Sequence, residues 1–148
     1  MLLHKNHKFI FNNRAAIEIP DNVYLDTNPD LCPVEGMVLF SADLLTQIDI
    51  NFVETDKDAW TFLKETKDDF ENFECLEPIR AVIVNGMSGF VLNYALSKET
   101  FEEYALSVPG DEPLLLNVCF VQKKGKLADA TECARLRDET IAGLSLVE

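Results

Sequence analysis

The apolar, β-rich runs of the chain are most concentrated across residues 80–121, in its second half. Two β-rich runs there flank Asn85 and Gly86, and both residue types accept the positive φ that a two-residue type I′ hairpin turn requires. Two further runs, 101–108 and 114–121, are separated by a loop that contains two prolines and a glycine. The pattern predicts a four-stranded antiparallel meander, around which the rest of the chain is organised.

Residues 101–108 fit two different periodicities. Phe101 and Tyr104 would share one face of a helix, whereas Tyr104, Leu106 and Val108 alternate as they would in a strand. Because the Pro- and Gly-containing loop that follows is typical of a hairpin connection into the next apolar run, we interpret the segment as a strand.

Shorter runs in the first third of the chain also have strand character, at 8–11, 15–19, 36–41 and 47–53. In the last of these, Ile48, Ile50 and Phe52 occupy one face and polar residues occupy the other. Residues 21–35, which lie between the runs at 15–19 and 36–41, contain two prolines and several Asp and Asn residues, which indicates an irregular loop.

The first predicted helix covers residues 55–74, from a capping Thr55 to a position shortly before Pro78. We expect its apolar face to pack on the sheet through Trp60, Leu63, Phe70 and Phe73. The outward face is acidic and carries Glu65, Asp68, Asp69 and Glu71.

A second helix is predicted near the C-terminus, where Asp129 and Glu132 form a capping-box pattern. An apolar stripe runs along this helix, made of Ala130, Cys133, Ala134, Ile141 and Leu144. Arg137 falls on the same stripe. We favour the interpretation that its aliphatic stem packs on the stripe while its guanidinium reaches water. The alternative is an anchor for an anionic ligand or for a carboxylate of a partner.

The run 114–121 is apolar on both faces, so we expect the sheet to be covered on both sides. With the two helices, this predicts an α+β fold, in which a central antiparallel sheet of about six or seven strands has helices on both faces, as an α/β/α sandwich. A chain of 148 residues has the size of one domain, and we expect residues 1–148 to form it, with 1–7 frayed.

The charge is the unusual part of the composition, since 26 acidic and 13 basic residues give a net charge of −13. Neutralising nucleic-acid phosphates requires basic patches, so the charge argues against a nucleic-acid partner. It equally disfavours an anionic membrane surface. We favour solubility as the reason for the acidity, and a basic protein partner stays open as the alternative.

The cysteines indicate a reducing compartment. Cys32, Cys75, Cys119 and Cys133 include no CxxC pair, and we expect all four to be free thiols, with Cys119 in an apolar strand and Cys133 in a helix. The N-terminal residues lack the apolar core of a signal peptide, and no apolar run is long enough to span a bilayer. A cytoplasmic location follows as the expectation.

Few residues offer catalytic or metal-binding chemistry. The two histidines, His4 and His7, lie in the segment expected to fray, so a metal site or a histidine-dependent catalytic triad is disfavoured. No nucleotide-binding glycine pattern is present, and the acids near Asp56 and Asp58 are explained by helix capping. We therefore expect no cofactor, no metal and no enzymatic activity.

Four short motifs are informative together: the segment 15–20, the acid-capped helix after the strand at 47–53, the hairpin sequence 84–90 with its Val-Asn-Gly start, and the closing helix before Leu144. They resemble the Mog/PsbP-like fold family, and its DcrB-like bacterial branch in particular. The resemblance spans roughly residues 8–146. It implies a binding or assembly protein, since some DcrB-like members look like adaptor chaperones for secreted effectors.

These observations together predict a non-enzymatic cytoplasmic protein-binding or adaptor protein. The alternatives are an immunity-type inhibitor of a basic toxin, and a hydrolase or isomerase that depends on carboxylates alone. The expected partner is another protein, with monomer and homodimer both left open. The predicted partner surface consists of Glu65, Asp68, Asp69, Glu71 and Arg137.

Overall fold

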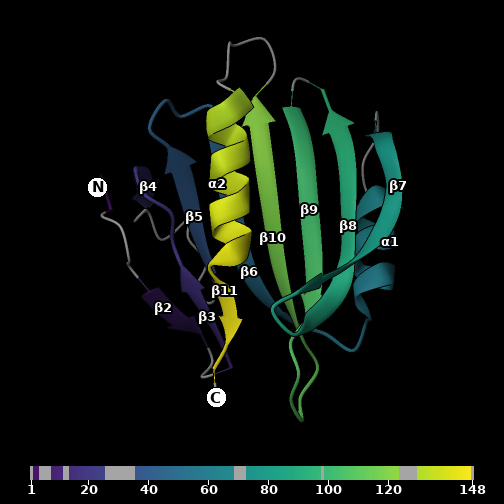
Figure 1. Cartoon of the computed structure of the whole chain (residues 1–148). Helices are drawn as coiled ribbons and strands as arrows, with labels where there is room; N and C mark the ends of the chain where they lie inside the picture. Colours follow the sequence, from purple (N-terminus) through teal and green to yellow (C-terminus); the bar gives the residue numbers. More distant parts are fainter. Residues whose placement is uncertain are drawn as a thin grey trace.

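In the computed structural model, the central hairpin turns where the sequence predicts. Strands β7 (Phe73–Val84) and β8 (Met87–Leu96) meet at Asn85 and Gly86, whose φ angles are 47° and 88°. Positive φ at both turn residues is the requirement of a type I′ turn, so this prediction is confirmed. Strands β9 (Glu99–Ser107) and β10 (Leu114–Lys123) follow in antiparallel pairing and complete the predicted meander (Figure 1). The ambiguous segment at 101–108 is therefore a strand.

The structure describes residues 2–3, 8–11, 14–25, 36–68, 73–97, 99–123 and 130–147. Its remaining strands are β1 (Leu2–Leu3), β2 (Lys8–Phe11), β3 (Ala15–Glu18), β4 (Val23–Leu25), β5 (Gly36–Ser41), β6 (Thr46–Glu54) and β11 (Leu144–Leu146). The helices within these ranges are α1 (Ala59–Asp68) and α2 (Ala130–Ala142). The sequence-predicted strands at 8–11, 15–19, 36–41 and 47–53 all correspond to observed ones.

The strands form two sheets rather than one. The large sheet has eight strands in the order β1-β4-β5-β6-β10-β9-β8-β7, and the small one has three in the order β11-β3-β2. In the small sheet, Leu144 pairs with Ile17, which brings the C-terminal strand beside the N-terminal hairpin. The small sheet lies over the lower part of the large one (Figure 1).

The predicted α/β/α sandwich is wrong, because strands dominate the fold and the helices do not form layers on both faces of the large sheet. One face is covered by α2 together with the small sheet (Figure 1). In the described part of the chain, α1 contacts the opposite face at β8 and β9, near one edge. The sequence pattern did not separate the strands of the small sheet from those of the large one, since both contain short apolar runs.

The two faces have separate hydrophobic cores. The larger core joins the small sheet and α2 to the large sheet, through fully buried side chains that include Ile17, Leu39, Leu116 and Leu136. The smaller core lies under α1 and consists of Ala59, Leu63, Leu92, Tyr94, Ala105 and Leu115. The alternation within β8, β9 and β10 sends successive side chains to opposite cores, which explains why residues 114–121 are apolar on both faces.

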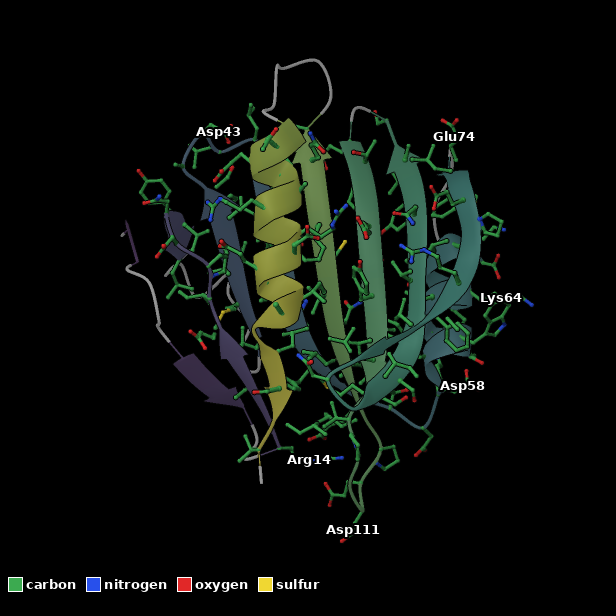
Figure 2. The ribbon with its side chains drawn as sticks, in the orientation of Figure 1. Arg14, Asp43, Asp58, Lys64, Glu74 and Asp111 are labelled. Carbon is green, nitrogen blue, oxygen red and sulfur yellow. The ribbon has the colours of Figure 1, made fainter. Side chains whose placement is uncertain are left out.

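Helix α1 is shorter than predicted and begins at a different cap. Asp58, which is labelled beside the start of α1 in Figure 2, is the N-cap rather than Thr55. Its Oδ1 accepts the backbone N–H of Thr61 at 2.7 Å. Leu63 is buried as expected, but Trp60 is 43% exposed and makes an edge contact with Phe90 of β8. Phe73 belongs to β7 and stacks on Tyr94 across the strand pair.

The side of helix α2 that faces the sheet is not the apolar stripe that the sequence predicted. Its fully buried side chains are Leu136 and Thr140, which face the sheet. Cys133, Arg137 and Ile141 lie half-buried along one side. The stripe that contains Arg137 therefore runs beside the core contact rather than through it.

Other sequence predictions lie partly outside the described residues. Cys75, Cys119 and Cys133 are free thiols, and Cys119 is buried, whereas Cys32 falls outside. So do the predictions for residues 1, 4–7 and 26–35, for Asp69, Phe70 and Glu71, and for the Asp129 cap. Leu2–Leu3, which were expected to fray, instead pair with β4 as strand β1. Val23–Leu25 form β4 inside the predicted loop, because they pair with both β1 and β5. Among the helices that the structure describes, neither is long and apolar enough to cross a membrane.

Candidate functional site

A groove runs between α2 and the β7–β8–β9 part of the large sheet, on the face that α2 covers. Its upper cleft, of about 230 Å³, has walls from α2 and β7 and a floor from β8, β9 and β10. Its lower cleft, of about 280 Å³, lies between α2 and the end of the β7–β8 hairpin. Tyr104 lines the lower cleft, and Arg137 lines both. We refer to the two clefts together as the α2–β7 groove.

A cluster of charged side chains occupies the middle of this groove. The Glu102 carboxylate accepts a hydrogen bond from the Tyr104 hydroxyl at 2.5 Å. Arg137 Nη1 lies 3.6 Å from Glu102 Oε2, and Arg80 Nη2 lies 4.0 Å from Glu102 Oε1. The two arginines come from α2 and β7, so the cluster joins the walls of the groove across its floor. Glu102 is 19% exposed, and both arginines are considerably more accessible.

The electrostatics of the cluster follow from burial and these contacts. Burial raises the pKa of Tyr104, and the hydrogen bond to the Glu102 carboxylate raises it further, so the tyrosine stays a hydrogen-bond donor. The hydrogen bond from Arg137 Nε to Asp138 at 3.1 Å raises the pKa of Arg137. A guanidinium has five N–H donors, and at these separations neither arginine is bidentate with Glu102. The cluster can therefore present donors to an incoming carbonyl or carboxylate.

Strand alternation places these residues on one face. Glu102 and Tyr104 are two apart on β9, so both point to the α2 side. Arg80 and Tyr104 both pair with Val91, from opposite sides of β8. On α2, Cys133, Arg137 and Ile141 are four residues apart and share the side that lines the groove.

Apolar side chains surround the charged cluster. Leu76 on β7 is 47% exposed at the rim of the upper cleft, and Phe120 and Ala134 line the same cleft. At the upper end, Thr46 Oγ1 and Cys133 Sγ are 3.0 Å apart, which ties α2 to β6. The groove thus combines apolar walls with a few polar groups, as ligand and peptide sites commonly do.

A third cleft, of about 290 Å³, lies at the C-terminal end of α2. It is lined by three acids, Glu18, Asp21 and Glu139. Arg135 forms an ion pair with Glu139 at 2.7 Å, which offsets part of this negative charge. Within the described ranges, no three His, Cys, Asp or Glu side chains gather as a metal site would require.

The predicted partner surface divides into two places. Glu65 and Asp68 are exposed on α1, where Glu65 pairs with Lys57, and Asp69 and Glu71 lie outside the described residues. Arg137 lies in the α2–β7 groove, on the opposite face of the sheet. The structure therefore does not bring Arg137 together with the described acids of the predicted surface.

Sequence reasoning singled out Arg137 but missed Glu102, Tyr104 and Arg80. One signal was present in the sequence: Glu102 shares a face of its strand with Tyr104 and Leu106, and that face is otherwise apolar. A charged residue on an otherwise apolar face is costly to bury unless another group pairs with it. The identity of that partner depended on the placement of α2, which the sequence pattern did not provide.

No protein-family model matches the chain, and no curated protein matches it at a significant level. Solved structures do share its fold. The crystal structure of LpqN, involved in cell envelope biogenesis of Mycobacterium tuberculosis, matches with a TM-score of 0.63 and 15% identity, over 90% of this chain and 83% of that one. A protein from Bacteroides thetaiotaomicron matches with a TM-score of 0.56 and 13% identity, over 98% of this chain and 49% of that one. This chain therefore spans about half the length of the Bacteroides protein. At such low identities the likeness concerns the fold alone.

Proposed function

We propose that this chain is a non-enzymatic protein-binding or adaptor protein, and that the α2–β7 groove receives a segment of another protein. The observation that carries the proposal is the combination of exposed apolar side chains on the groove wall with a charged cluster that spans its floor. Apolar contacts would supply affinity, and the donors of Arg80 and Arg137 would fix the register of the bound segment.

The shape of the groove favours a segment over a compact small ligand. Along α2 it extends from Cys133 to Ile141, a rise of about 12 Å at 1.5 Å per residue. It is divided by Arg137 rather than closed around one enclosed cavity. An extended or helical segment can contact both clefts at once, and recognition of this kind uses a few anchors along a groove.

The arrangement of the acids supports binding rather than acid–base catalysis. Catalysis by carboxylates alone requires two of them converging on one cleft with separated pKa values. In the described part of the α2–β7 groove, Glu102 is flanked by arginines, and Asp138 is exposed and hydrogen-bonded to Arg137. Both acids therefore act as partners of guanidinium groups here.

We also propose that the chain belongs to the Mog/PsbP-like fold family and that it is located in the cytoplasm. The Mog/PsbP-like resemblance of the sequence supports a binding or assembly role. Free Cys75, Cys119 and Cys133 support a reducing, cytoplasmic location.

Site-specific photocrosslinking tests this function with two matched leucines. A benzoylphenylalanine is placed at Leu76 on the groove rim, or at Leu44 in the β5–β6 turn, since both side chains are exposed. After irradiation in the native cells, we expect discrete protein adducts from position 76 but not from position 44. The Arg137→Glu change should weaken the adducts at position 76. Equal adducts at both positions, or none at 76, would contradict the proposal. So would a bound small molecule detected by native mass spectrometry of the purified protein.

A further inference from the structure

Two cations share one carboxylate at the centre of the α2–β7 groove. Arg80 and Arg137 approach Glu102 from the two walls, at 4.0 and 3.6 Å. Both separations are longer than a hydrogen bond between charged groups, which is about 2.7–2.9 Å. Glu102 takes its short contact from the neutral Tyr104 hydroxyl instead, at 2.5 Å. Neither arginine therefore holds the carboxylate closely.

Most donors of the two guanidinium groups are unused. In the described part of the chain, their one hydrogen bond runs from Arg137 Nε to Asp138. Each guanidinium has five N–H donors, and both arginine side chains are roughly half exposed. Asp138 lies largely in solvent, which weakens its charge, so two positive charges face the one negative charge of Glu102. The middle of the groove is thus locally positive in a chain of net charge −13.

Apolar side chains lie on both sides of this charged centre. The upper cleft is lined by Leu76 and Phe120, and the lower cleft by Ile83 and Ile141. Arg137 lines both clefts and divides them. The end of the β7–β8 hairpin crosses in front of the sheet toward α2 (Figure 1) and forms the other wall of the lower cleft. A cleft of about 280 Å³ between these walls has room for a side chain rather than for a helix, which is about 10–12 Å across.

The spacing along α2 fits an extended segment. Cys133 at the upper cleft, Arg137 at the division and Ile141 at the lower cleft are four residues apart, which is about 6 Å at 1.5 Å per residue. Alternate residues of an extended chain point to the same side and lie about 6.8 Å apart. Three successive side chains on one side of such a segment therefore match the upper cleft, the arginines and the lower cleft.

We propose that the α2–β7 groove binds an extended segment of another protein in which an Asp or Glu has an apolar residue two positions away on each side. The inference rests on the proposed function and adds the chemistry of the partner. The acidic side chain lies between Arg80 and Arg137, and the two apolar side chains fill the clefts. This pattern reads the same in both directions, so it does not depend on the direction of the bound segment.

Charge complementarity is the reason to expect an acid at the central position. A carboxylate accepts two parallel N–H bonds from a guanidinium, and such charged hydrogen bonds are roughly twice as strong as those to a neutral amide. A basic side chain would meet two like charges at the same place. A segment with many acids would be repelled by the net charge of −13, so a single acid between apolar residues is expected.

Calorimetric titration of the full chain with capped nonapeptides is the test. The parent peptide has a central glutamate, a leucine two positions away on each side, and serine and glycine elsewhere. Replacing the glutamate by glutamine should raise the Kd by roughly tenfold or more, because charged hydrogen bonds are lost. Lysine at the centre should abolish binding. Moving the leucines to four positions away, as a helix would space them, should weaken it.

Protein variants connect the binding to the arginines. Arg137→Glu should abolish binding of the glutamate peptide and favour the lysine peptide. Lys64→Glu, on the exposed side of α1 on the opposite face (Figure 2), changes the net charge equally and should leave the Kd unchanged. Arg80→Gln is a milder change in the groove and should weaken binding of the glutamate peptide several-fold. Circular dichroism confirms that each variant is folded.

The outcomes separate this inference from the proposed function. Equal binding of the glutamate and glutamine peptides, tighter binding with the helical spacing, or no binding at millimolar peptide would overturn the inference. Equal losses in Arg137→Glu and Lys64→Glu would also overturn it. Protein adducts at Leu76 together with any of these results would leave the proposed function intact. Tight, Arg137-dependent binding of the glutamate peptide without adducts at Leu76 would contradict the proposed function alone.

Discussion

Glu103 is a buried acid in the middle of β9, on the face opposite α2. Its carboxylate accepts hydrogen bonds from the Tyr94 hydroxyl at 2.7 Å and from Asn117 Nδ2 at 3.0 Å. Burial raises the pKa of Tyr94 and of the adjacent Cys119 thiol, so both remain protonated at neutral pH. The acid is thus held by two neutral donors, each of which offsets part of the desolvation of the carboxylate.

Removing one of these donors should destabilise the protein. We expect Tyr94→Phe to lower the free energy of unfolding by about 1.5–3 kcal/mol, the usual contribution of a hydrogen bond to a charged group. The change keeps the ring, which stacks between Phe73 and Phe101. Urea unfolding measures the effect, and Tyr24→Phe in β4 is the control. Equal losses in the two variants would show that the hydroxyl of Tyr94 has no special role.

The Asn85–Gly86 turn predicts a second stability effect. We expect Gly86→Val to destabilise by about 2 kcal/mol or more, because a β-branched residue is strained at the observed φ of 88°. A Cβ at this position would also lie 3.2 Å from Leu146 Cδ1. Ser88→Val, on the exposed side of the following strand, is the control. Urea unfolding that fails to distinguish the two variants would contradict the turn assignment.

Asp43 and Asp49 predict opposite pH dependences. Hydrogen bonds from Ser41 Oγ and the Leu45 N–H lower the pKa of Asp43, so its contribution to stability is present above its unfolded pKa, 3.8 in model compounds, and is lost as pH falls through its lower folded value. Burial raises the pKa of Asp49, so its charge opposes folding at neutral pH, and this penalty disappears as pH falls through the raised value.

The two asparagine variants make this difference measurable. At neutral pH, Asp43→Asn should be less stable than the wild type and Asp49→Asn more stable. Both differences should shrink on acidification, the Asp49 difference first, because its folded pKa is the higher of the two. Thermal unfolding between pH 7 and about pH 3 provides the measurement. A difference of constant size across this range would mean that titration of the carboxyl group is not its cause.

Among the elements, α1 separates core from surface contributions. Leu63→Ala should lower the free energy of unfolding by about 2–5 kcal/mol, because Leu63 is fully buried in the smaller core. The Glu65→Gln, Asp68→Asn pair should change it by less than about 1 kcal/mol, since both acids are exposed and the Lys57–Glu65 ion pair is in solvent. Urea unfolding compares the two variants, and similar losses in both would place the acidic face in contact with other parts of the chain.

Individual elements also show which features of the fold can be predicted from the sequence. The meander was predictable because Asn85–Gly86 defines a turn and alternation defines its flanking strands. The length of α1 was not, because Phe73 continues the helical spacing of Trp60 and Leu63 although it pairs with Leu96 in a strand. The orientation of α2 was also missed, because Thr140 at its buried face is polar. With that orientation unknown, Glu102 and Arg80 could not be joined to Arg137.

For the whole molecule, sheet topology explains what local patterns could not. The small sheet joins residues near the N-terminus to Leu144–Leu146, a pairing that depends on the final position of α2. Asn85 Nδ2 donates to the Leu144 carbonyl at 2.5 Å, so the same C-terminal strand also contacts the central hairpin. Long-range pairings of this kind follow from packing rather than from the residue types at either end.

The presence of two cores on opposite faces has a dynamic consequence. The smaller core contains α1 and adds to strands that are already held from the other face by the larger one. Detaching α1 would expose a limited apolar surface while the larger core stays intact, so partial opening should require less free energy than global unfolding. Native-state hydrogen exchange should then show amides of α1 exchanging at lower denaturant than those of β6 and β10. A single free energy of opening for all three elements would mean that the molecule unfolds as one cooperative unit.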